Sequence, residues 1–273
     1  EKKRYKIITL ENSFHGRTIT TVKATGQSSF HQSKFAPYPD GFSFNAIDDV
    51  YNAIDDETVA VMIELVQGEG GVFPFDKEKI KELAKFLKEN DILLIIDEVQ
   101  TGVFRTGEFL ASNLYDIEPD IITLAKGIGG GVPMGAVMTK HKDIWTAGDH
   151  GSTFGGNYLV TAAALEVLDI LENLKDSGTL DETIIYFTKK LNDIFEANRD
   201  IFITHVGLGL MRGLRVKDAD TLASLIKTAF EFGVMVLKSG NNTLRFLPAL
   251  TISKSEIDEG FIRLQKAITK IKS

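Results

Sequence analysis

Short apolar runs alternate with amphipathic stretches of helical period through the first two thirds of the chain. The runs that predict strands are residues 6–10, 59–65, 92–97, 120–125 and 135–140. Between two of them, residues 76–90 place Ile80, Leu83 and Leu87 on one face, which predicts a helix. Fully apolar strands that alternate with helices indicate an α/β protein whose sheet is mostly parallel and covered on both faces.

The pattern changes after a long, alanine-rich helical stretch at residues 156–174. From there the chain predicts a helix, strands, a helix, two strands and a final helix, which together suit a smaller α+β unit. We place the boundary near residue 175, with a large domain at 1–175 and a small domain at 176–273. A chain of 273 residues is long enough to give both a core.

Composition narrows the class of protein. The net charge is −7 with basic and acidic residues mixed, so the clustered basic surface that nucleic acid requires is not expected. The chain has no cysteine, which excludes disulfides and thiolate metal sites and fits a reducing cytoplasm. The five histidines are dispersed, so we expect no metal site. We see no signal peptide and no apolar run of roughly 18 residues, and therefore expect no membrane partner.

Polar residues follow three of the predicted strands. Asp97 and Glu98 end the run at 92–97, and Lys126 follows the run at 120–125. Glu64 lies at the end of the run at 59–65. Ligands of open α/β sheets gather at the carboxyl ends of the strands, so we expect one shared site there. Spacing alone leaves an alternative open, in which these groups cap helices and Lys126 is solvated.

The glycines around Lys126 favour a ligand site over a solvated lysine. Gly127 and the run 129–131 let the backbone approach a ligand closely. A nucleotide P-loop has its glycines before the lysine, so this order excludes one. The stretch "GLGLMRG" at 207–213 has the wrong spacing for a dinucleotide fingerprint and predicts a strand with close backbone packing.

A lysine and a carboxylate at strand ends suit one cofactor well. Pyridoxal phosphate is held by a lysine through a Schiff base and by a carboxylate on its pyridinium nitrogen. The sequence therefore predicts that Lys126 carries the cofactor and moves a proton at the substrate, and that Asp97 holds the ring nitrogen.

The chain resembles the class III, fold-type-I aminotransferases over nearly its whole length. The motifs that carry the resemblance are "NSFHGRT" (12–18), "IELVQGEGGV" (63–72), "IIDEVQTGVFRTG" (95–107), "LAKGIGGGVPMGA" (124–136), "HGSTFGGNYLVTAAALEVL" (150–168) and "LRFLPAL" (244–250). They occur in the family's order. The resemblance implies a pyridoxal-phosphate-dependent transaminase that works as a cytoplasmic homodimer.

The resemblance also assigns roles to single residues. It implies that Lys126 and Asp97 are catalytic. The cofactor-binding residues that it implies are Phe14, Asp97, Glu98, Val99, Gln100, Lys126 and Thr153. The substrate-binding residues that it implies are Arg17, Ser152, Glu69 and Arg245. Within these sets, Ser152 and Thr153 would reach the site from the partner subunit, and Phe14 would stack on the pyridine ring.

Glu69 and Arg245 together would let one pocket serve two substrates. Arg245 would bind the α-carboxylate of glutamate or 2-oxoglutarate, and Glu69 would neutralise Arg245 when the other substrate is bound. Without the resemblance, Glu69 is better explained as an exposed loop carboxylate.

The reaction implied is transfer of an amino group from N-acetylornithine to 2-oxoglutarate in arginine biosynthesis. It would give N-acetylglutamate semialdehyde and glutamate, and the same site would accept succinyldiaminopimelate. Ornithine, succinylornithine and 4-aminobutyrate are the alternative donors. An alternative of another class is a non-catalytic dimerisation or binding fragment with an incomplete cofactor site.

The sequence departs from the family in two places. Leu65 stands where the family usually has proline, which affects the rigidity of the loop and not the chemistry. The family's small-residue loop before a phosphate-binding helix has no match. We therefore expect a truncated or partly resolved chain, with weaker cofactor affinity if the polypeptide truly lacks that helix N-terminus.

Overall fold

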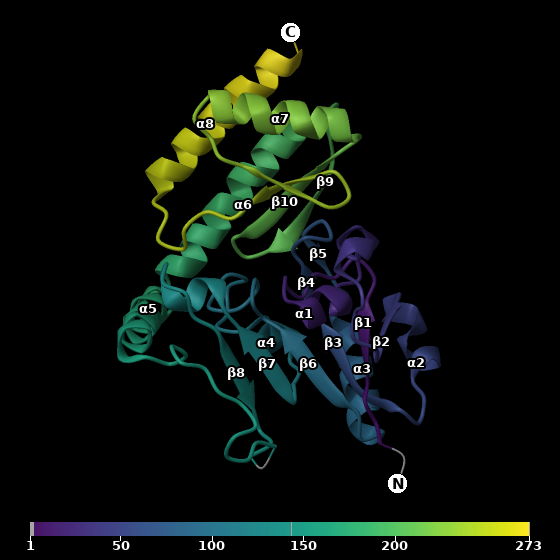
Figure 1. Cartoon of the computed structure of the whole chain (residues 1–273). Coiled ribbons are helices and arrows are strands. Elements are labelled where there is room, and N and C mark those ends of the chain that lie inside the picture. The colour runs from purple at the N-terminus through teal and green to yellow at the C-terminus, as the bar shows by residue number, and fades with distance from the viewer. Residues whose placement is uncertain (1–2, 143, 273) are drawn as a thin grey trace. The chain divides into compact units, whose positions relative to one another are not determined.

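The structure is a computed structural model that describes residues 3–142 and 144–272. Its contacts divide the chain into two compact units (Figure 1). Unit 1 takes the described residues up to Leu65 together with 75–103 and 110–169. Unit 2 takes 66–74, 104–109 and the described residues from 170 onward. The units group residues by contact and do not test independent folding, so the domain boundary near residue 175 stays a prediction.

Unit 1 is built on a six-stranded sheet in the order β2-β1-β3-β6-β7-β8, in which only β8 is antiparallel to its neighbour (Figure 1). Its strands are β1 (Lys6–Leu10), β2 (Phe42–Asn45), β3 (Thr58–Ile63), β6 (Leu93–Asp97), β7 (Ile121–Leu124) and β8 (Ala136–Thr139). The mostly parallel α/β sheet is thus confirmed. Sequence reasoning missed β2, because its four residues are too few for their apolar–polar alternation to stand out, and none of them is fully buried.

Both faces of this sheet are covered. Ala60 and Val61 are neighbours in β3, so their side chains point to opposite faces, yet both are completely buried. The helices that lie wholly or partly in unit 1 are α1 (Ile19–Ala24), α2 (Val50–Ala53), α3 (Lys77–Glu89), α4 (Ala111–Tyr115) and α5 (Tyr158–Asp176). Helix α3 is capped by the preceding residue, Asp76, whose side chain accepts a hydrogen bond from the amide of Lys79 at 3.0 Å, and it packs on β6.

Unit 2 has the α+β class that the sequence predicts for the smaller part of the chain, and it also includes 66–74 and 104–109. An antiparallel sheet runs in the order β11-β12-β10-β9, and β4 pairs with β5. Its strands are β4 (Val66–Gln67), β5 (Phe73–Pro74), β9 (Phe202–Leu208), β10 (Met211–Val216), β11 (Leu237–Ser239) and β12 (Thr243–Phe246). Its helices are α6 (Thr179–Ala197), α7 (Ala219–Glu231) and α8 (Lys254–Lys272), of which α8 packs on both others.

The glycine-rich stretch 207–213 differs from its prediction. It is not one strand, because β9 ends at Leu208 and β10 starts at Met211 as its antiparallel partner. Gly207 and Gly209 take positive φ angles of +94° and +53°, which favour glycine and let the chain reverse. The close packing is real, since a Cβ on Gly207 would lie 2.1 Å from the carbonyl oxygen of Met211.

Two further features of the described residues bear on membrane and metal binding. Among residues 3–142 and 144–272, no helix combines the length and apolar character needed to cross a bilayer. Within the same ranges, no three histidine, aspartate or glutamate side chains gather as a metal ion would require.

Candidate active site

Asp97 and Lys126 come from the same end of two neighbouring parallel strands. Asp97 is the last residue of β6 and stands opposite Thr123 of β7, and Lys126 follows three residues later. The Asp97 side chain is buried, and its Oδ1 accepts hydrogen bonds from Val99 N at 3.0 Å and Thr123 Oγ1 at 3.2 Å. Lys126 is exposed and takes a left-handed φ of +47°, a strained angle for a residue with a side chain.

His15 is a third hydrogen-bond partner of Asp97, a contact that the sequence did not predict. Its Nδ1 lies 2.8 Å from Asp97 Oδ2, and its side chain is fully buried. The imidazole therefore donates to the carboxylate through Nδ1. The opposite nitrogen, Nε2, is buried without a hydrogen-bond partner in the part of the chain that the structure describes. The sequence offered one signal for this contact. His15 lies in the segment after β1, and that segment starts at the same carboxyl edge of the sheet where Asp97 lies.

These contacts test whether Asp97 suits a cofactor ring. Three donors hold the carboxylate in one orientation, and a carboxylate has about four lone-pair sites. One further hydrogen bond can therefore be accepted at a buried, preset anion. That is the acceptor that a protonated ring nitrogen requires, so the residues fit pyridoxal phosphate.

Phe14 and Arg17 lie in the segment that carries His15. The amide of Phe14 donates to Glu64 Oε1 at 2.7 Å, which ties this segment to the end of β3. The Phe14 ring lies 5.3 Å from that of Phe30, and the Arg17 guanidinium lies 4.5 Å above the Phe30 ring. Phe14 is half-buried and Arg17 is exposed, so their predicted contacts with cofactor and substrate stay predictions.

Glu98 has a structural role that differs from the role of Asp97. It is 1% exposed, and its carboxylate accepts hydrogen bonds from Thr101 Oγ1, Ala111 N and Ser112 N. Burial raises the pKa of Glu98, although these donors pull it down. The side chain thus holds the start of α4. The cofactor contacts expected of Glu98, Val99 and Gln100 stay predictions.

Glu69 and Arg245 form an ion pair within unit 2. Glu69 Oε1 lies 2.6 Å from Arg245 Nη1, which also donates to the carbonyl oxygen of Gly68 at 3.0 Å. Arg245 is buried in β12, and Glu69 is half-buried, so Glu69 is not the exposed loop carboxylate of the alternative explanation. The resemblance predicts this ion pair, and its role in substrate exchange stays a prediction.

Ser152 and Thr153 lie exposed in the loop between β8 and α5. The Oγ atom of Ser152 accepts a hydrogen bond from Gly155 N at 2.9 Å. Both hydroxyls are thus on the surface of the single chain, where a partner subunit could use them, and their contacts with a shared site stay predictions.

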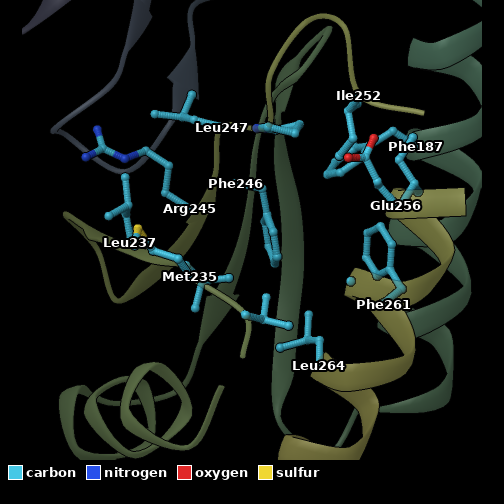
Figure 2. A pocket seen from close by; sticks show the side chains of 15 residues that line it. Phe187, Met235, Leu237, Arg245, Phe246, Leu247, Ile252, Glu256, Phe261 and Leu264 are labelled. Atoms are coloured by element: carbon cyan, nitrogen blue, oxygen red, sulfur yellow. The ribbon is translucent and has the colours of Figure 1, made fainter. Parts of the chain in front are cut away.

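A pocket of about 290 Å³ is lined by residues of unit 2 (Figure 2). Phe187, Phe246 and Phe261 contact one another along its wall. The carboxylate at its edge, Glu256, already accepts from Ser253 N at 2.8 Å. Figure 2 shows Arg245 pointing away from the phenylalanines, as expected for the residue before Phe246 in a strand. The pocket is lined mainly by apolar side chains, and the charged residues among its described lining are Arg245 and Glu256.

Comparison with known proteins agrees with this geometry. The model of the family "Aminotransferase class-III" matches residues 1–268. The chain is 57% identical to the acetylornithine aminotransferase of Wolinella succinogenes, over 99% of the chain and 69% of that protein. It is 41% identical to a succinylornithine transaminase of Salmonella enteritidis, over 98% of the chain and 67% of that protein.

A solved structure also resembles the fold. The ornithine aminotransferase of Toxoplasma gondii, described with partial occupancy of PLP at its active site, gives a TM-score of 0.89 at 29% identity. The match covers 98% of this chain and 65% of that one, so the chain spans just under two thirds of that structure. A mostly parallel sheet with a lysine and a buried carboxylate at its carboxyl edge, together with these matches, supports a pyridoxal-phosphate-dependent transferase. The chain belongs to the class III aminotransferases, which confirms the resemblance read from its motifs.

Glu98→Gln tests the buried carboxylate at the start of α4. The amide places an N–H₂ group among three donors, so we expect the free energy of unfolding to fall by about 1–3 kcal/mol. Because the folded-state pKa of Glu98 is raised, the native protein binds this proton more tightly than the unfolded chain does. Native stability therefore rises relative to the variant as pH falls from neutral toward 4.5, the ordinary value.

Urea unfolding of both proteins between pH 8 and pH 4.5 measures this difference. All other titrating groups are shared and cancel in the comparison. A difference between the two proteins that stays constant or shrinks at low pH would contradict the raised pKa.

Proposed function

We propose that this protein is a pyridoxal-phosphate-dependent aminotransferase that moves the amino group of N-acetylornithine to 2-oxoglutarate. The products are N-acetylglutamate semialdehyde and glutamate, a step of arginine biosynthesis. One observation carries the proposal: a buried aspartate, locked by His15, ends the strand next to the one that leads to Lys126. Family membership and 57% identity to an acetylornithine aminotransferase support it.

The chain's own residues divide the work around the cofactor. Pyridoxal phosphate, when bound, supplies an electron sink for the carbon that bears the amino group. Asp97 would accept a hydrogen bond from its ring nitrogen, and His15 would keep Asp97 in place. Lys126 would hold the cofactor through Nζ and move a proton at the substrate. Phe14 would lie against the ring, with Gln100 on its hydroxyl side.

Substrate recognition falls to charged residues. Arg17 would bind the carboxylate of the amino donor, and Arg245 the α-carboxylate of glutamate or 2-oxoglutarate by a bidentate pair. Glu69 already pairs with Arg245 at 2.6 Å, so a dicarboxylate must displace it before it can bind. An amino donor that has no second carboxylate for Arg245 leaves the ion pair intact. One site could thus accept two substrates in turn.

Succinylornithine is the second donor to consider, because a transaminase with that name is 41% identical to this chain. Ornithine is the third, through the Toxoplasma structure at 29% identity. Both relatives are less similar than the acetylornithine enzyme, which is why N-acetylornithine is proposed first. Succinyldiaminopimelate and 4-aminobutyrate complete the set of donors to compare.

Exposed apolar side chains on residues 137–165 support a homodimer. Those with more than half of their surface exposed are Val137, Trp145, Phe154, Tyr158, Leu159 and Leu165. Such a set is costly to leave in water and is typical of a protein–protein interface. The same stretch carries Ser152 and Thr153, so a second copy covering it would bring these hydroxyls to a shared site. Location in the cytoplasm remains a prediction of the cysteine-free composition.

Lys126→Ala tests the cofactor assignment. The native protein mixed with pyridoxal phosphate should show a visible absorbance band that borohydride removes, because Lys126 holds the cofactor covalently. The variant should lose the band and at least about a thousandfold of kcat. Lys85→Ala, at an exposed lysine of α3, is the matched control and should keep both. A band that survives in Lys126→Ala would point to another lysine, and a colourless native protein would favour the non-catalytic alternative.

Donor preference is measured separately as kcat/KM for N-acetylornithine, succinylornithine, ornithine and 4-aminobutyrate. We expect N-acetylornithine to lead ornithine by at least about tenfold, since ornithine would place a second ammonium where the acyl group belongs. A preference for ornithine would overturn the donor assignment and leave the cofactor assignment standing.

Tyr158→Asp tests the homodimer. Tyr158 is 95% exposed in the single chain, and a carboxylate there would be buried in the proposed interface. Sedimentation velocity should show a dimer for the native protein and at least about tenfold weaker association for the variant. Ile185→Asp, at an exposed isoleucine of α6 outside the stretch, should leave the dimer unchanged. A native monomer would overturn the proposal.

A further inference from the structure

The segment that carries Glu69 is an excursion of the chain. Unit 1 ends its first stretch at Leu65 and resumes at Phe75, and residues 66–74 between them belong to unit 2. Within the excursion, β4 pairs with β5, matching Val66 with Pro74 and Gln67 with Phe73. The position of Glu69 thus depends on how the two ends of this excursion are held.

The base of the excursion is closed by a buried tyrosine. The amide of Phe75 donates to the carbonyl oxygen of Leu65 at 3.1 Å. The hydroxyl of Tyr115, the last residue of α4, lies 3.1 Å from that same oxygen and 2.8 Å from the carbonyl oxygen of Phe75. Tyr115 is 3% exposed, and burial raises its pKa, so the hydroxyl stays a donor at any working pH.

The position of Tyr115 is itself preset. Its helix α4 has only five residues, too few to be stable alone. Glu98 accepts hydrogen bonds from Ala111 N and Ser112 N and so holds the first turn of that helix. Glu98, the residue next to Asp97, thus holds helix α4, and Tyr115 at the end of that helix closes the base of the segment that carries Glu69.

The tip of the excursion is held within unit 2 and carries strain. Ser239 Oγ donates to the carbonyl oxygen of Gly68 at 2.7 Å, and Gly240 N donates to that of Glu69 at 2.9 Å. Between the tip and the base, Val72 takes a φ of +55°. A β-branched residue in that region is strained and persists only where the surroundings hold it. Loosening one end lets the segment relax.

We infer that Tyr115 is a positioning residue for the Glu69–Arg245 ion pair, and so helps to set how readily the protein exchanges a dicarboxylate for the amino donor. This inference rests on the proposed function. With the base closed, little conformational freedom is lost when Glu69 pairs with Arg245, because the segment is already ordered. With the base open, the ion pair forms less readily, and a dicarboxylate displaces Glu69 more easily.

Tyr115→Phe tests the inference, because it removes one hydroxyl and keeps the ring. The probe is glutarate, an unreactive dicarboxylate, titrated by calorimetry into the protein saturated with pyridoxal phosphate. We expect Glu69→Ala to bind glutarate about tenfold more tightly than the native protein, and Tyr115→Phe about threefold more tightly. In the Glu69→Ala background, Tyr115→Phe should change nothing, because no ion pair is left to weaken.

Two controls separate the possible failures. Tyr38→Phe removes another hydroxyl that donates to a main-chain carbonyl, that of Gln32, and should not alter glutarate affinity. Arg245→Ala should weaken glutarate binding strongly; if it does not, the proposed role of Arg245 fails and the inference falls with it. If Arg245→Ala weakens binding but Tyr115→Phe has no effect, or the same effect with and without Glu69, the inference alone is overturned.

A kinetic measurement distinguishes positioning from a general loss of stability. In Tyr115→Phe, kcat/KM for the amino donor should fall relative to kcat/KM for 2-oxoglutarate by about threefold. A variant that is merely less stable would lower both values equally, which would count against the inference.

Discussion

Strand β6 ends in two adjacent carboxylates, Asp97 and Glu98, that are almost completely removed from water. An ionised carboxylate is tolerated in such a place only where donors surround it. Asp97 receives Val99 N, Thr123 Oγ1 and His15, while Glu98 receives Thr101 and the first amides of α4. The need to satisfy these two anions draws together the segment after β1, the neighbouring strand β7 and helix α4. Much of the carboxyl edge of the sheet follows from that need.

The two carboxylates have different roles in the structure. Asp97 is the proposed cofactor contact, since its remaining lone pair suits a ring nitrogen. Glu98 holds the start of helix α4, and this helix ends at Tyr115, which closes the segment leading to Glu69. Residues implied in cofactor binding and residues implied in substrate exchange are therefore linked through one short helix. If the proposed roles hold, a substitution in this helix would alter the choice of substrate without contacting either reactant.

Sequence patterning predicted the regular parts of the fold because burial there repeats along the chain. The strands ending at Asp97 and before Lys126 are mostly apolar, and helix α3 repeats its apolar face at the helical period. Short elements escaped, such as β2, where four residues offer too few repeats. The pairing of His15 with Asp97 also escaped, since residues 82 positions apart meet only once the sheet has formed. The resemblance to a family supplied the Glu69–Arg245 pair, which no local pattern predicts.

The excursion at residues 66–74 has a consequence for the order in which the chain is made. Val66 and Val72 are completely buried, and they form a cluster with Met211, which lies well over a hundred residues further along the polypeptide. A ribosome releases these valines long before it has made the strand that covers them. During that interval the segment is an apolar loop in water, exposed to chaperones and proteases. Loss of the region around β10 would therefore leave Val66 and Val72, in the segment that carries Glu69, without the residue that covers them.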